Sequence, residues 1–115
     1  MYFRFHNKVP YEKTLIFTKD LFSLTGKLPD YEKSGVIKQL RAMGSSVLQD
    51  LAESYAGRSK DESLRSLDRS IKTIAKIVSM IDLCHNLGYI PSATHNSWII
   101  ACEDLSKQLE ETRKS

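Results

Sequence analysis

The hydrophobic residues between Ser59 and Leu87 follow a single helical stripe. They are spaced 3, 4, 3, 4 and 3 positions apart, at Leu64, Leu67, Ile71, Ile74, Val78 and Ile81. An α-helix brings positions with this spacing onto one face, so the pattern predicts a long amphipathic helix with one buried side. The sequence Ser59-Lys60-Asp61-Glu62 has the form of a capping box and marks the start of the helix. Gly88 and Pro91 mark its end.

Three other segments show the same periodicity, and we expect helices over about residues 10–25, 31–55 and 92–112. Gly26 and Pro29 end the first of them, and Asp30 offers an N-cap for the second. The expected inner faces are Tyr11, Leu15, Thr18, Phe22 and Thr25 (widened by Leu21 and Leu28), then Val36, Leu40, Met43, Val47, Leu51 and Tyr55, and finally Trp98, Cys102, Leu105 and Leu109.

These elements predict an all-α protein, an antiparallel up-down-up-down four-helix bundle. The bundle is expected over residues 10–112, preceded by an N-terminal arm (1–9) and followed by a frayed end (113–115). The second helix contains a run of small residues around Gly44. A glycine within a helix costs roughly 1 kcal/mol relative to alanine, so something should compensate. Either a neighbouring helix approaches closely at this point, or a ligand lies against bare backbone.

The composition excludes several classes of protein. With 115 residues, 41% hydrophobic and 27% charged, the chain fits one soluble domain. The first six residues are too short for a secretory signal, and the longest charge-free run (83–102) holds histidines, asparagines and a proline, which favours a cytoplasmic protein without a membrane span. Cys84 and Cys102 fall at heights that do not match across the predicted hairpin, so we expect buried free thiols.

We expect neither an enzyme nor a cofactor site. His6, His85 and His95 do not pair with each other or with cysteines or carboxylates at metal-ligand spacing, and there is no glycine-rich phosphate loop. His85 continues the apolar stripe of the third helix, so we interpret it as structural.

The positive charges on the third helix form a second stripe. Arg65, Arg69, Lys72 and Lys76 are spaced 4, 3 and 4 positions apart. They fall within an arc of roughly 60°, nearly opposite the apolar face. The residues that could widen this surface are Lys38, Arg41, Arg58 and Lys60. The net charge of +3 permits an anionic partner without requiring one, and Asp68 beside the stripe partly offsets it.

A resemblance to a known family covers about residues 10–112. The matching segments are Gln39-Leu40-Arg41-Ala42, Ser46-Val47, Leu51-Ala52-Glu53, Gly57-Arg58, Pro29-Asp30-Tyr31-Glu32 and Leu87-Gly88-Tyr89-Ile90. Their order and spacing resemble the four-helix-bundle family first noticed in intervening sequences of bacterial 23S ribosomal RNA genes. Asp50 and Ser54 depart from it, because the family usually has asparagine and glycine there.

Two further segments are the run Leu48-x-x-Leu51-Ala52-Glu53-Ser54-Tyr55-Ala56 and the start of the third helix, Leu64-Arg65 followed by Ile71. They are similar to a divergent branch of the same superfamily, the accessory variability determinants of diversity-generating retroelements. Those proteins are basic homopentamers that bind a reverse transcriptase and nucleic acid. The resemblance therefore implies a homopentameric bundle and, for this branch, contact with nucleic acid and with a reverse transcriptase.

Two hypotheses follow. The first is a non-enzymatic homo-oligomer that binds RNA or DNA through the basic face of the third helix, as an accessory to a reverse transcriptase. The second is a protein–protein adaptor or structural oligomer with no nucleic-acid role. Apolar residues available for an interface under either hypothesis are Ile16, Phe17, Leu24, Ile77 and Trp98. The aromatic and basic N-terminal residues Tyr2, Phe3, Arg4 and Phe5 could stack on bases or pack against the bundle.

Overall fold

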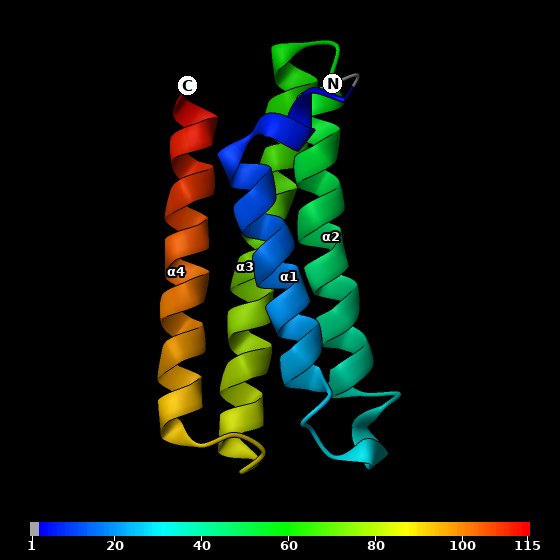
Figure 1. Ribbon diagram of the computed structural model, residues 1–115, viewed down its shortest axis with the longest axis vertical. Helices are drawn as coiled ribbons and strands as arrows, with labels where there is room; N and C mark the ends of the chain where they lie inside the picture. Colours follow the sequence, from blue (N-terminus) through cyan, green and yellow to red (C-terminus); the bar gives the residue numbers. More distant parts are fainter. Residues whose placement is uncertain (1–2) are drawn as a thin grey trace.

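The computed structural model describes residues 3–115, within which the chain forms four α-helices and no strand. The helices are Val9–Thr25 (α1), Val36–Ala56 (α2), Lys60–Asn86 (α3) and Ser92–Lys114 (α4), with short 3₁₀ helices at Arg4–Asn7 (η1) and Asp30–Glu32 (η2). Consecutive helices run in opposite directions along an elongated body of 44 × 23 × 22 Å (Figure 1). The prediction of an all-α four-helix bundle is confirmed.

The core contains most of the residues that the periodicity selected. The side chains with at most 1% exposure include Leu21, Leu40, Val47, Leu51, Ile74, Ile77, Ile81, Cys84, Cys102 and Leu109. Burial raises the pKa of both thiols, and that of Cys102 rises to about 12, with a smaller contribution from the negative charge of Asp82. Both cysteines are free, as expected from the sequence. A thiol with such a pKa is almost entirely protonated at neutral pH and is therefore a weak nucleophile.

The predicted inner face of α1 is partly wrong. Leu15 and Phe22 remain 48% and 39% exposed, whereas Thr14 and Phe17 are buried. The helix can bury threonines because their hydroxyl groups are satisfied locally: Thr14 Oγ1 donates to the carbonyl of Pro10 at 2.8 Å. The buried face of α1 is therefore rotated relative to the most hydrophobic face of the helix.

The start of α2 also differs from the prediction, since the helix begins at Val36 and not near residue 31. Glu32 accounts for this difference. Its Oε1 accepts a hydrogen bond from the backbone N–H of Val36 at 3.3 Å, and its Oε2 accepts one from the hydroxyl of Tyr89 at 2.6 Å. This hydrogen bond is the main cause of the raised pKa of Tyr89. Glu32 therefore caps α2 and ties it to the turn that joins α3 and α4.

The other helix boundaries agree closely with the sequence. Ser59 Oγ accepts from the N–H of Glu62 at 3.2 Å, as a capping box requires. The Glu62 carboxylate reaches back to the N–H of Arg58 at 2.8 Å, one residue earlier than expected. Gly88 has φ = +78°, which suits the glycine predicted to end α3. Helix α4 continues to Lys114, beyond the predicted fraying point at residue 112.

Gly44 lies at a close contact between α1 and α2. A Cβ atom at this position would stand 2.9 Å from Cδ2 of Leu21 and 3.6 Å from Cγ2 of Thr18. The buried carbonyl of Gly44 accepts a hydrogen bond from Thr18 Oγ1 at 3.2 Å. The expected close approach of a neighbouring helix is therefore present, and the gain in packing compensates for the glycine.

Candidate nucleic-acid interface

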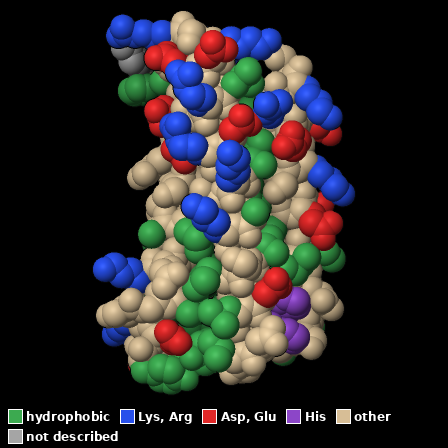
Figure 2. All heavy atoms as spheres, turned by 180° about the vertical axis from the view of Figure 1, so that it is seen from behind, with side chains coloured by type: hydrophobic (Ala, Val, Ile, Leu, Met, Phe, Trp, Pro, Cys, Tyr) green, Lys and Arg blue, Asp and Glu red, His purple; other side chains and the backbone are tan. Residues whose placement is uncertain are grey.

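The basic stripe (Arg65, Arg69, Lys72 and Lys76) lies on the outer face of α3, with all four side chains exposed. Figure 2 shows the side of the bundle away from α1: lysines and arginines gather over one half of its length, with acidic side chains among them, and hydrophobic side chains lie over the other half. Within the described residues, Arg65, Lys72 and Lys76 form no ion pair. Their charges are therefore available to an anionic partner.

Arg69 differs from the other three because carboxylates from α2 hold it. Its Nη2 lies 3.0 Å from Oε2 of Glu53, and its Nε lies 3.6 Å from Oδ1 of Asp50. Arg69 therefore joins α2 to α3 and contributes little net charge to the stripe. The sequence did not reveal this, because the partners come from another helix.

Asp68, the acidic residue beside the stripe, is paired as well. Arg113 of α4 donates from Nε to Oδ1 of Asp68 at 2.6 Å, and this hydrogen bond raises the pKa of Arg113. The negative charge that was expected to offset the stripe is thus balanced from the neighbouring helix. Asp68 therefore does not offset Arg65, Lys72 and Lys76, whereas Asp61 and Glu62 in the first turn of α3 form no ion pair within the described residues.

Two hollows adjoin the stripe at the loop between α2 and α3. The side hollow, of about 350 Å³, is lined by Glu53, Ala56, Gly57, Arg58, Glu62, Arg65, Ser66 and Arg69. The end hollow, of about 420 Å³, is lined by Arg4, Lys8, Ser54, Tyr55, Gly57, Arg58, Ser59, Lys60 and Ser63. They share Gly57 and Arg58, so the basic surface continues from the stripe around the end of the bundle. Gly57 is required there, because a Cβ would collide with the hydroxyl group and backbone of Ser63.

Sequence reasoning missed the contribution of the N-terminal segment to this surface. Arg4 donates from Nη2 to the carbonyl of Tyr55 at 2.7 Å, which fastens η1 over the C-terminal end of α2. The ring of Phe5 lies 4.7 Å from that of Tyr11, between ring centres. The arm therefore packs on the bundle and brings Arg4 and Lys8 to the end hollow. Tyr2, which the sequence analysis included, lies outside the described residues.

The structure does not bring Arg41 to the stripe. Its Nε donates to Oγ1 of Thr25 at 2.8 Å, and its guanidinium carbon lies 5.2 Å from the centre of the Phe22 ring, so the side chain packs on α1. Lys38 is exposed near the start of α2. It stands about 18 Å along that helix from Asp50, which contacts the stripe. Neither residue is part of the surface that we propose below.

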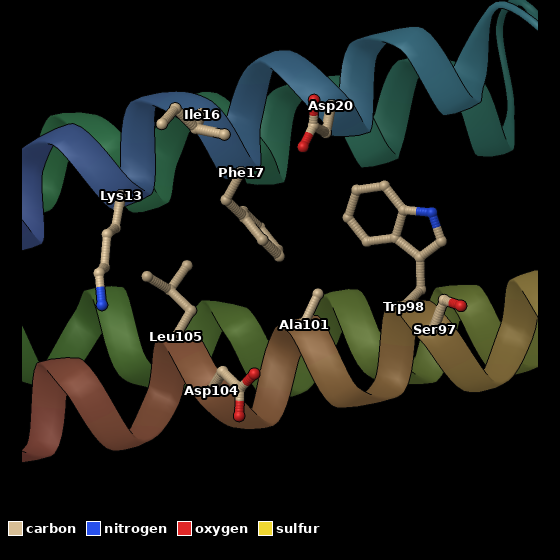
Figure 3. Close-up of a pocket in the computed structure, with 9 residues that line it drawn as sticks. All are labelled: Lys13, Ile16, Phe17, Asp20, Ser97, Trp98, Ala101, Asp104 and Leu105. Carbon is tan, nitrogen blue, oxygen red and sulfur yellow. The ribbon is translucent and has the colours of Figure 1, made fainter.

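A largely apolar groove with a volume of about 480 Å³ lies between α1 and α4. It is lined by Lys13, Ile16, Phe17, Asp20, Ser97, Trp98, Ala101, Asp104 and Leu105. Figure 3 shows Phe17, Trp98 and Leu105 pointing between the two helices. Lys13 of α1 bridges the two helices, because its Nζ donates a hydrogen bond to Oε1 of Gln108 of α4 at 3.2 Å.

The apolar residues predicted for an interface divide into two groups. Ile16 is 59% exposed at the rim of the groove, and Trp98 is half-buried in it. Phe17, Leu24 and Ile77 are instead core residues, at most 7% exposed, because the buried face of each helix is wider than the main stripe. Of these three, only Phe17 also borders the groove.

His85 and His95 form a structural pair at the end of the bundle where α3 meets α4. The rings of His85 and His95 are stacked with centres 4.4 Å apart. His95 Nε2 lies 2.8 Å from Oδ1 of Asp82, and His85 Nε2 lies 3.1 Å from Oγ of Ser92.

Among residues 3–115 no group of three or more histidines, cysteines or carboxylates is placed to hold a metal ion. In the same part of the chain, no helix combines the length and the apolarity needed to cross a bilayer.

Comparison with known protein families gives a match over most of the chain. The profile of the family described as 23S rRNA-intervening sequence protein matches residues 7–111, which is nearly the whole chain. No curated protein matches the sequence.

Proposed function

The chain belongs to the 23S rRNA-intervening sequence protein family, and from this premise we propose that it is a non-enzymatic, homo-oligomeric protein that binds nucleic acid. The binding surface consists of Arg65, Lys72 and Lys76 on α3, continued by Arg58 and Lys60 at the loop before α3. The observation that carries the proposal is that these cations form no ion pair within residues 3–115, while Asp68 beside the stripe is paired with Arg113.

The geometry suits contact with a phosphate backbone. Arg65 and Lys76 stand about 16 Å apart along α3, so the stripe can contact several phosphates in succession. Lysine and arginine bind phosphates mainly by charge and by release of counterions, independently of base sequence. We therefore propose a sequence-tolerant interaction in which Arg69 positions α2 against α3 and does not itself carry the affinity.

The test is binding of the purified, nuclease-treated protein to a fluorescent structured RNA and to a DNA duplex, by fluorescence anisotropy. We expect affinity to fall steeply between about 50 and 200 mM salt, because each phosphate contact releases counterions. A linear fall of log K with log salt gives the number of contacts. Absence of binding at the lower salt, from protein shown to be folded by circular dichroism, would overturn the proposal.

We propose that a second copy of the chain occupies the apolar groove between α1 and α4. A second copy would cover the exposed Ile16 and the half-buried Trp98 and remove their apolar surface from water. This burial stabilises the assembly, because apolar surface in contact with water is unfavourable. Assembly through α1 and α4 would leave the stripe on α3 open. Copies of the stripe would then act together, which multiplies affinity through avidity. A homopentamer is the assembly that the family resemblance implies.

Replacing Ile16 by glutamate is expected to disrupt this assembly. Light scattering after size exclusion should give a multiple of 13.1 kDa for the wild type and 13.1 kDa for I16E, because a carboxylate at the rim cannot be buried without a partner. L83E is the matched control, since Leu83 is also exposed (43%) but lies on α3 away from the groove. A monomeric wild type, or dissociation by L83E and not by I16E, would contradict the assignment of the groove.

A reverse transcriptase is the protein partner that we propose, in line with the resemblance to the accessory variability determinants. The alternative is an adaptor or structural oligomer without a nucleic-acid role. The oligomer at the groove is common to both functions, so only the salt-dependent binding measurement separates them.

A further inference from the structure

The end hollow gathers four cations and no acidic residue among the side chains that line it. Arg4 and Lys8 come from the N-terminal segment, and Arg58 and Lys60 come from the loop and the first turn of α3. The carboxylate of Glu62 is turned to the backbone of Arg58 and lines the side hollow. Four like charges around one hollow repel each other, so this arrangement favours an anion with more than one negative charge.

Hydroxyl groups complete the polar lining. Ser59 Oγ accepts a hydrogen bond from the N–H of Glu62, which leaves its own O–H to donate. The side chain of Ser63 also lines the hollow, and Gly57 allows it to stand close to the loop. A hollow with cations and hydroxyl donors matches the three terminal oxygens of a phosphate monoester, which carries about −1.5 to −2 charges at pH 7. An internal phosphodiester carries one negative charge.

The hollow is also larger than a phosphate group needs. Its volume of about 420 Å³ is in the range typical of sites for small organic ligands. Tyr55, whose half-buried ring lines the wall, offers a surface on which a base can stack. The hollow meets the side hollow at Gly57 and Arg58, and the side hollow leads to Arg65. A strand lying along the stripe would therefore bring its end to this place.

We propose that the end hollow binds the phosphorylated end of a nucleic-acid strand, with the terminal phosphate held by Arg4, Lys8, Arg58 and Lys60. This inference rests on the proposed function, since the stripe is taken to hold the rest of the strand. It adds that the protein distinguishes a phosphate end from a hydroxyl end, and that the N-terminal segment takes part in binding.

The test compares one labelled single-stranded RNA sequence in three forms, with a 5′-phosphate, with a 3′-phosphate and with hydroxyl groups at both ends. We expect one phosphorylated form to bind about tenfold more tightly than the hydroxyl form, the gain from one or two additional charge-assisted hydrogen bonds. The double variant K8Q/K60Q should lose this preference. Because Lys60 also belongs to the proposed binding surface, affinity for the hydroxyl form should fall as well, and the ratio of the affinities for the phosphorylated and hydroxyl forms is the readout. Neither lysine forms an ion pair within residues 3–115, so the fold should tolerate both changes.

The matched control is K72Q/K76Q, which removes the same charge from the stripe and should weaken all three forms equally. Equal binding of the three forms by the wild type would overturn the inference and leave the proposed function standing. A preference that persists in K8Q/K60Q would place the phosphate elsewhere and also overturn it. Inorganic phosphate should remove the preference for the phosphorylated form at concentrations that leave the hydroxyl form bound, because both would occupy the end hollow. If no form binds, both proposals fail.

Discussion

Changing Arg65, Lys72 and Lys76 together to glutamate is expected to weaken RNA and DNA binding at least about 100-fold at low salt, since three phosphate contacts become repulsive. The slope of log K against log salt should fall by about 3 for each subunit that contacts the strand. Fluorescence anisotropy at several salt concentrations measures both quantities. The fold should be preserved, because none of these three side chains has an ion-pair partner among residues 3–115.

Arg69 is left unchanged in this variant for a structural reason. A glutamate at that position would face Asp50 and Glu53 and would place three carboxylates together at the contact between α2 and α3. Loss of binding could then result from loss of structure. Reversal of Lys19, Lys27 and Lys107, which are exposed on other parts of the surface, changes the net charge by the same amount. Equal losses in the two triple variants would contradict a localised surface.

Replacing Gly44 by valine is expected to destabilise the bundle by about 3 kcal/mol. The first added carbon would already stand 2.9 Å from Leu21, which is fully buried and cannot turn away into solvent. Forcing additional methyl groups into a packed core typically costs 1–3 kcal/mol, and separating α1 from α2 also weakens the buried hydrogen bond from Thr18, worth about 1 kcal/mol.

Urea unfolding followed by circular dichroism measures this change. Valine at position 42 is the matched control, because Ala42 is exposed on the same helix and the substitution adds a β-branched side chain without crowding α1. We expect the midpoint of A42V to stay close to that of the wild type. A midpoint for G44V within the same range would show that α1 is not held against α2 at this position.

The sequence predicted the helices well where the determining contacts are local. The capping box at Ser59, the glycine at position 88 and the apolar spacing of α3 all depend on residues within one or two turns of each other. The inner face of α1 was predicted less well, because hydrophobicity favours Leu15 and Phe22 while packing against α2 selects Thr14 and Phe17. Threonine carries no strong signal for burial in a single sequence.

The candidate surface was only partly predictable for a related reason. Helical periodicity places Arg65, Arg69, Lys72 and Lys76 on one face, but it does not say which of them are neutralised. The partners of Arg69 come from α2 and the partner of Asp68 comes from α4, so they become visible only once the helices are packed. The same holds for Arg4, which reaches Tyr55 across 51 positions of sequence.

Several residues that carry the family resemblance serve the fold. Glu32 and Tyr89 belong to two matching segments that are far apart in the chain, and in the structure they share a hydrogen bond of 2.6 Å. Gly88 in the second segment supplies the positive φ of the turn. In this chain these parts of the signature therefore determine how α2 is joined to the turn between α3 and α4, and they do not involve the outer face of α3.

The chain enters and leaves the bundle at the same end, beside the loop between α2 and α3 (Figure 1). A domain fused to either terminus would thus be tethered near the basic surface, at a local concentration set by its linker. In an oligomer, several fused domains would lie near one bound strand. The bundle could therefore be used as a scaffold that delivers enzymes to nucleic acid. For the same reason, an affinity tag at either terminus should be cleaved before affinities are measured.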